Sequence, residues 1–74
     1  MLRLKDLRED NDLKQSKISK KLNITQAAYS YYETGKRNIP NETLIKFAKF
    51  YDTSTDYILG ITNEKKPYKK AEKE

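Results

Sequence analysis

With 74 residues, the chain has room for one small domain, near the lower size limit for a stable hydrophobic core. Sixteen Lys and Arg residues against eleven Asp and Glu residues give a net charge of +5, which favours a polyanionic partner. Cysteine and histidine are both absent, which excludes disulfides and thiolate chemistry and removes the commonest general base, so no enzyme activity, metal or cofactor is expected. No apolar run approaches the roughly 20 residues of a membrane span. We therefore expect a cytoplasmic chain with no membrane partner and no evident small-molecule ligand.

The first two predicted helices each carry one apolar face. The first runs over residues 2–11, where Leu4 and Leu7 recur at helical spacing. The second runs over residues 15–22, where Ile18 lies one turn before the leucine that ends it, and lysines occupy the outer positions. Both helices are therefore expected to pack inward on a common core.

The residues after the second helix predict a tight turn and a third helix. Asn23 lies where the second helix ends, and asparagine tolerates the left-handed conformation that such an end requires. Thr25 is a good N-cap for a helix over residues 26–34, which Gly35 ends. A helix, a turn of about three or four residues and a second helix form the motif that presents one helix to a DNA major groove. The pattern therefore predicts DNA binding.

The third predicted helix divides into an inner and an outer face. Tyr29 and Tyr32 face inward and are expected in the core, whereas the outward positions are Gln26, Ala27, Ser30 and Tyr31. The Gln26 amide can pair with N6 and N7 of adenine, and a solvated glutamine is the alternative. Ala27 can meet a thymine methyl group, or it can simply favour the helix. Tyr31 can lie on a base step or donate to a phosphate.

Two further helices complete the predicted fold. The fourth, over residues 41–51, carries apolar side chains three and four residues apart, and Asn41 is its expected cap. Asp52 stands at its end, where glycine is more usual. Ser54 caps a short fifth helix over residues 55–59. No β pattern or repeat is present, so the prediction is an all-α, five-helix domain.

The composition changes after Ile61. Residues 62–74 are rich in lysine and glutamate and contain Pro67, and such a segment buries too little apolar surface to offset its ordering cost. The sequence therefore predicts a folded domain over residues 1–61 and a flexible, disordered, charged tail over residues 62–74. The alternative is that the tail lysines touch DNA or that Tyr68 packs on a partner.

From about residue 4 to 61, the sequence resembles the lambda-repressor/Cro-like helix-turn-helix regulators, also called the Xre family. The segments that carry the resemblance are RLKDLRED, Gln15, the KKLNIT turn, AYSYYETGKRNIP and ETLIKFAKFYDTSTDYILG. The resemblance implies a lambda-repressor-like domain and a sequence-specific regulator of transcription that binds double-stranded DNA. Repression by occlusion of an operator is the expected mechanism. The alternative is a protein-interaction module of the same fold, such as an antitoxin that binds a toxin.

Positions that match the family's motif are the expected DNA contacts. Those that match base-contacting positions are Gln26, Ala27 and Tyr31. Those expected at phosphates are Gln15, Lys14, Thr25, Ser30, Lys36, Arg37 and Asn38. Lys14 stands where a Ser or Thr cap is commoner, and a bound phosphate can satisfy the free N–H groups at that helix start.

The resemblance also implies an ion pair between Arg8 and Glu33, which would remove repulsion between the carboxylate and DNA phosphates. One short helix reads only a few base pairs, so a homodimer on a near-palindromic operator is expected. Its two reading helices would lie ~34 Å apart in successive major grooves. The expected dimer contact consists of Tyr57, Ile58 and Ile61, with the monomer's own core as the alternative place for these side chains.

Overall fold

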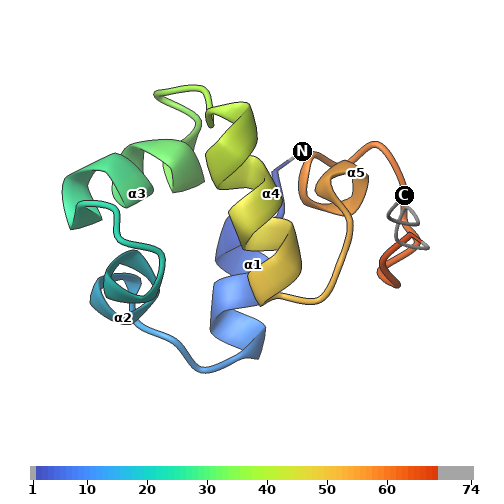
Figure 1. Cartoon of the computed structure of the whole chain (residues 1–74), viewed down its shortest axis with the longest axis horizontal. Helices are drawn as coiled ribbons and strands as arrows, with labels where there is room; N and C mark the ends of the chain where they lie inside the picture. The colour runs from blue at the N-terminus through green and yellow to red at the C-terminus, as the bar shows by residue number, and fades with distance from the viewer. Residues whose placement is uncertain (1, 69–74) are drawn as a thin grey trace, which may run out of the picture.

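The computed structural model describes residues 2–68, and within them the chain forms five α-helices and no strand. The helices are α1 (Leu4–Asp10), α2 (Gln15–Lys21), α3 (Gln26–Thr34), α4 (Asn41–Phe50) and α5 (Thr55–Ile58). Helices α2 and α3 lie together at one end of the molecule, α1 and α4 occupy the middle, and α5 lies at the other end (Figure 1). The predicted all-α, five-helix fold is confirmed.

One hydrophobic core joins all five helices. Its buried members are Leu4, Leu7, Ile18, Tyr29, Tyr32, Leu44, Phe47, Ala48, Tyr51 and Ile58. The rings of Tyr29 and Phe47 are fully buried and meet edge to face, with 5.8 Å between their centroids. This contact packs α3 against α4. The inward orientation predicted for Tyr29 and Tyr32 is confirmed.

Among residues 2–68, three residues other than glycine adopt the left-handed conformation. Asp12, Asn23 and Asp52 have φ angles of 54°, 57° and 53°. Asn and Asp pay the smallest penalty there among residues that carry a Cβ atom. The predictions for Asn23 and Asp52 are confirmed, and the turn at Asn23 directs the chain from α2 into α3.

Side-chain caps begin two of the helices. The side chains of Thr25 and Ser54 accept hydrogen bonds of 3.1 and 3.0 Å from the backbone N–H three residues further on. Both predicted caps are confirmed. The cap predicted at Asn41 is wrong, because Pro40 occupies the N-cap position and Asn41 is the first helical residue. Pro40, with φ −58° and ψ 146°, already supplies the extended conformation that precedes a helix.

The predicted tail, residues 62–74, falls in part outside the described residues, which end at position 68. Within the described part, Arg3 holds the chain against the end of α5. Its Nη1 donates to the Thr62 carbonyl and its Nη2 to Asn63 Oδ1, each at 2.8 Å. The same guanidinium lies over the Tyr57 ring, 4.2 Å from Cζ to the centroid. One arginine near the N-terminus thus contacts both α5 and the segment that follows it.

Candidate nucleic-acid interface

The outer face of α3 is open to solvent. Gln26 and Ala27 in its first turn are exposed, and Tyr31 is 41% exposed, whereas Ser30 is half-buried. Thr25 caps the helix and is itself exposed. Its hydroxyl oxygen accepts the cap hydrogen bond, so the hydroxyl proton can still be donated to a ligand. The start of α3 therefore offers polar groups that the core does not use.

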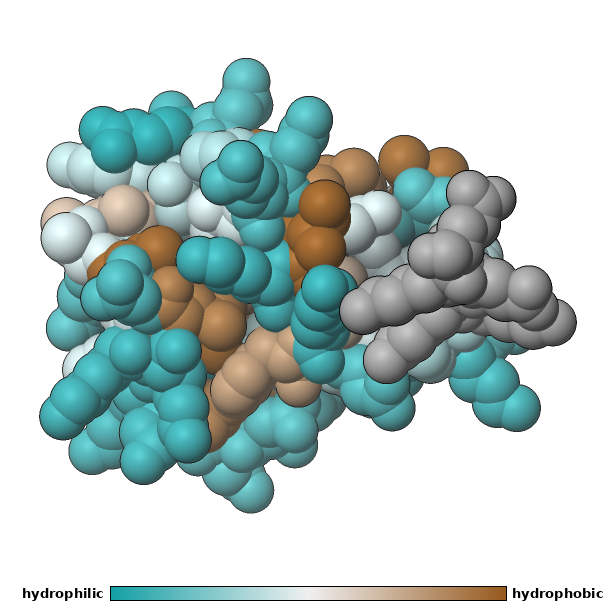
Figure 2. Space-filling model, viewed as in Figure 1, coloured by the Kyte–Doolittle hydropathy of each residue, from teal (hydrophilic) through white to brown (hydrophobic). Residues whose placement is uncertain are grey.

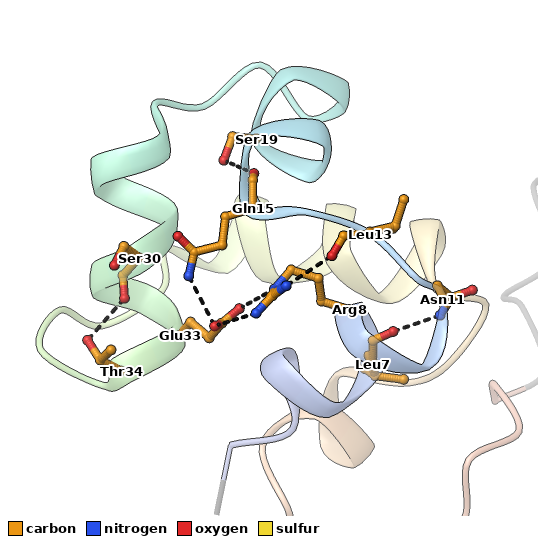
Figure 3. Close-up of polar contacts among 9 residues, drawn as sticks. All are labelled: Leu7, Arg8, Asn11, Leu13, Gln15, Ser19, Ser30, Glu33 and Thr34. Atoms are coloured by element: carbon orange, nitrogen blue, oxygen red, sulfur yellow. Dashed lines mark hydrogen bonds and ion pairs between the residues drawn. The ribbon is translucent and has the colours of Figure 1, made fainter.

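A buried ion pair lies beneath this helix and connects it to α1 and α2 (Figure 3). Arg8 donates from Nε to Glu33 Oε2 at 2.9 Å and from Nη2 to Glu33 Oε1 at 3.1 Å. Its Nη1 donates to the carbonyl oxygen of Leu13 at 2.9 Å. Gln15 adds a hydrogen bond of 3.2 Å from Nε2 to Glu33 Oε1. The structure thus brings together the two residues that the sequence predicts to pair, and adds Gln15 to them.

Burial and hydrogen bonding determine the charges of this cluster. Only 14% of the Arg8 side chain and 6% of the Glu33 side chain are exposed. Burial acts to raise the pKa of Glu33, but hydrogen bonds from Arg8 and Gln15 outweigh it and hold the pKa below its ordinary value of 4.5. The hydrogen bond to Glu33 in turn raises the pKa of Arg8. Glu33 is therefore an ionised, inward-facing carboxylate at the end of α3, and the charge of Arg8 balances its own.

Gln15 has a second role in this arrangement beside the expected phosphate contact. A glutamine amide carries two N–H donors, and Glu33 uses one of them. The backbone carbonyl of Gln15 also accepts a hydrogen bond of 2.6 Å from the hydroxyl of buried Ser19 (Figure 3). Both contacts fix the position of Gln15 at the start of α2, with one amide donor left over.

Two buried tyrosine hydroxyls belong to the core and not to the interface. Within residues 2–68, neither Tyr29 Oη nor Tyr51 Oη has a hydrogen-bond partner. Burial raises the pKa of Tyr29, and it raises the pKa of Tyr51 to about 12. Both side chains are therefore neutral and serve packing.

The loop after α3 folds back over the last turn of that helix. Gly35, with φ 78°, ends the helix in the left-handed conformation, and Lys36, Arg37 and Asn38 follow as exposed residues. The backbone N–H of Arg37 donates to the Tyr31 carbonyl at 3.3 Å. The Arg37 guanidinium lies over the Tyr31 ring, 5.0 Å from Cζ to the centroid. The sequence predicts a DNA contact for each of these two residues but carries no signal of the contact between them.

The start of α2 also lies at the surface. Lys14 is exposed and occupies the N-cap position with an extended backbone and without a side-chain cap hydrogen bond. This agrees with the missing cap that the sequence predicts.

Ser30, the expected phosphate contact within α3, is half-buried, and its carbonyl accepts a 3.0 Å hydrogen bond from the Thr34 hydroxyl (Figure 3). Expected contact residues thus occur before α2, along α3 and after α3.

The predicted dimer contact needs a correction. Ile58 is fully buried in the monomer, so it does not contribute to a surface, and its assignment to a dimer contact is wrong. The short α5 points this side chain into the core. Tyr57 is half-buried beneath the Arg3 guanidinium, and Ile61 is 71% exposed. Ile61 therefore remains the most accessible of the three predicted residues.

One face of the molecule combines hydrophobic and hydrophilic residues. Figure 2 shows a band of hydrophobic residues across the middle of one face, with hydrophilic residues around it. Within residues 2–68, no helix is long and apolar enough to span a membrane. The same residues contain no group of three or more His, Cys, Asp or Glu side chains that could hold a metal ion.

Five short helices around one core, with α2 and α3 joined by a tight turn and the outer face of α3 exposed, define a helix-turn-helix domain. The helix-turn-helix family model matches residues 4–58, and the chain belongs to this family of Xre-like regulators. The resemblance in sequence is therefore confirmed. No solved structure matches the chain.

Three curated relatives come from Bacillus subtilis (strain 168). The uncharacterized HTH-type transcriptional regulator YobD is 35% identical over 65 residues, which are 88% of this chain and 58% of the relative. The uncharacterized HTH-type transcriptional regulator YqaE is 43% identical over 63 residues, 84% of this chain and 54% of the relative. The HTH-type transcriptional regulator ImmR is 40% identical over 58 residues, 78% of this chain and 46% of the relative. The chain spans about half the length of these relatives.

Proposed function

We propose that this chain is a regulator of transcription that binds double-stranded DNA sequence-specifically through α3. The observation that carries the proposal is the contrast between the two sides of this helix. Its outer side exposes Gln26 and Ala27, whereas its one acidic residue, Glu33, is turned inward and neutralised by Arg8. An unpaired carboxylate on the outer side would repel phosphates. The helix therefore presents an uncharged surface of a size that fits a major groove.

Two groups of side chains have different roles in this proposal. Gln26 and Ala27 read base edges from the first turn of α3, since a glutamine amide matches adenine and a methyl group matches thymine. Tyr31 lies one turn further along the same face. The phosphate contacts come from Ser30 within α3 and from residues that flank the helix in sequence or in space, namely Lys14, Gln15, Thr25, Lys36, Arg37 and Asn38. Contacts of this second kind position a protein without reading sequence.

A selection experiment tests the proposal. The chain is incubated with a library of random-sequence DNA duplexes at several salt concentrations, and the bound fraction is sequenced. We expect one sequence to be enriched, with an affinity that falls as salt rises. If no sequence is enriched at any salt concentration, the chain is not a sequence-specific DNA-binding protein.

We infer repression by occlusion as the mode of regulation. A bound helix-turn-helix domain covers its site, and this alone excludes polymerase when the site overlaps a promoter. The test places the enriched duplex either within a promoter or upstream of it, and measures transcription in vitro. We expect inhibition from the overlapping position only. Stimulation from the upstream position would identify an activator instead.

Binding as a homodimer follows from the small size of one interface. A single helix of nine residues contacts a few base pairs, which is too few to single out one site in a genome. Ile61, 71% exposed, and Leu59, 38% exposed, are apolar residues at the α5 end that a second copy would cover. Sedimentation of the saturated complex with the enriched duplex should give two chains per site. One chain per site would contradict the dimer.

The competing function is a protein-interaction module, such as an antitoxin. One observation favours it, a groove of about 470 Å³ lined by both apolar and polar residues, namely Leu2, Ile39, Leu44 and Leu59 together with Tyr32, Gly35, Arg37, Asn38 and Asn41. A partner segment with apolar side chains would fit such a groove. The duplex selection separates the two functions, because a module that binds only protein enriches no duplex.

A further inference from the structure

We infer that Tyr31 is a positioning residue that holds the Arg37 guanidinium for contact with a DNA phosphate. The inference rests on the proposed function and extends it by one residue pair. Tyr31 thus acts on DNA through Arg37, and Arg37 depends on Tyr31 for its orientation. The two form one phosphate-binding unit, whereas Lys36 beside them acts alone.

Two separate contacts attach Arg37 to Tyr31. The backbone N–H of Arg37 donates to the Tyr31 carbonyl at 3.3 Å, which fixes where the arginine leaves the loop. The guanidinium then lies over the Tyr31 ring at 5.0 Å, within the distance at which a cation is attracted to the face of an aromatic ring. The left-handed turn at Gly35 makes both contacts possible, because it reverses the chain after α3.

The position of the Arg37 guanidinium over the Tyr31 ring suits a phosphate contact. A guanidinium carries five N–H donors around its edge, so a ring on one side of the group leaves donors free for a phosphate. Holding it there before binding reduces the conformational freedom that the contact would otherwise cost. The exposed Lys36 is a flexible point charge, and within residues 2–68 its ammonium group lies over no aromatic ring. Arg37 is therefore the more specific of the two neighbouring cations.

The stack also changes the role of Tyr31. The sequence leaves two roles open for this residue, a ring that lies on a base step or a donor to phosphate. The guanidinium occupies one face of the ring, so that face does not meet a base. Tyr31 is 41% exposed, which means that its truncation leaves the core intact.

The test measures the affinity of single and double variants for the duplex enriched by the wild-type chain and for a scrambled duplex of the same length. Tyr31→Leu removes the aromatic face, and we expect it to weaken binding to both duplexes about two- to fivefold. Tyr31→Phe keeps the ring and should therefore bind both duplexes with wild-type affinity. In an Arg37→Ala background, Tyr31→Leu should have no further effect, whereas in a Lys36→Ala background it should have its full effect.

A second measurement examines the stack without DNA. The side-chain protons of Arg37 should show ring-current shifts in the NMR spectrum of the wild-type chain and of Tyr31→Phe, and lose them in Tyr31→Leu. If Tyr31→Leu lowers the DNA affinity equally in the wild-type and the Arg37→Ala background, the inference is overturned. A loss of affinity confined to the enriched duplex would also overturn it, because it would mean that Tyr31 contacts a base. If the wild-type chain enriches no duplex at all, the proposed function fails and this inference fails with it. If the chain binds DNA but the affinity losses of Tyr31→Leu and Arg37→Ala are additive, the proposed function stands and only this inference fails.

Discussion

Arg8 on α1 donates to both carboxylate oxygens of Glu33 on α3, at 2.9 and 3.1 Å (Figure 3), and little of either side chain is exposed to water. Gln15 at the start of α2 donates to the same carboxylate. Three helices therefore meet at one charged group. The pair fixes the orientation of α3 relative to the rest of the domain, and Arg8 balances the negative charge of Glu33 on the helix that we propose to lie against DNA.

The first prediction concerns the stability that this pair provides. Arg8→Ala leaves the Glu33 carboxylate buried without its main partner, and breaking a buried pair in this way costs about 3–5 kcal/mol in the free energy of unfolding. Denaturant unfolding followed by circular dichroism measures it. The matched control is Lys5→Ala, an exposed cation on the same helix, which should change stability by less than about 0.5 kcal/mol.

The double variant Arg8→Ala/Glu33→Ala completes a thermodynamic cycle. We expect it to be less destabilised than the two single variants together, because removal of both charges leaves no unpaired carboxylate. Strict additivity of the two losses would show that the side chains do not stabilise one another.

The second prediction is a pH dependence of stability. The pKa of Glu33 is lower in the folded chain than its ordinary value of 4.5. A carboxyl group with a lowered pKa binds protons more readily when unfolded, so it contributes stability above pH 4.5 that is lost as the pH falls through the folded pKa. Denaturation at neutral pH and at about pH 3 should show a larger loss for the wild type than for Glu33→Gln. Equal losses would mean that other carboxyl groups carry the dependence.

The third prediction concerns the turn that ends α3. Gly35 has φ 78°, and an added Cβ atom would meet nothing within 4 Å, so only the backbone conformation penalises a side chain there. Gly35→Ala should therefore cost about 1–2 kcal/mol of unfolding free energy. Gly35→Asn is the matched variant and should cost less, because asparagine tolerates this conformation better. Equal costs for the two variants would show that the left-handed turn is not retained.

The fourth prediction separates charged from uncharged phosphate contacts. Lys36→Ala should weaken binding to the enriched and the scrambled duplex alike, and should flatten the dependence of log affinity on log salt by about one unit. Gln15→Ala removes no charge, so it should weaken binding with little change in that slope. If Gln15→Ala flattens the dependence of log affinity on log salt more than Lys36→Ala does, these assignments are contradicted.

The helix-turn-helix itself is predictable from the sequence because its signals are local. Asn23, Thr25 and Gly35 each satisfy a backbone requirement at their own position, and the structure shows all three in that role. The family resemblance added the pairing of Arg8 with Glu33, which are 25 residues apart and carry no local signal of contact.

The contacts that were missed depend on where long side chains end. The guanidinium of Arg3 reaches Asn63, 60 residues away, and Arg37 turns back onto Tyr31. Neither contact leaves a pattern in the sequence. Ile58 was misassigned because α5 has four residues, little more than one turn, and so short a helix shows no periodic face.

The most direct test of sequence reading by α3 is the affinity of Gln26→Ala for the enriched and the scrambled duplex. Gln26 is exposed in the first turn of α3, so its replacement leaves the fold intact and removes only an amide. We expect a loss of about 1–3 kcal/mol in binding free energy on the enriched duplex and almost none on the scrambled one. Equal weakening on both duplexes would contradict the account, because Gln26 would then contact the backbone of DNA and not its bases.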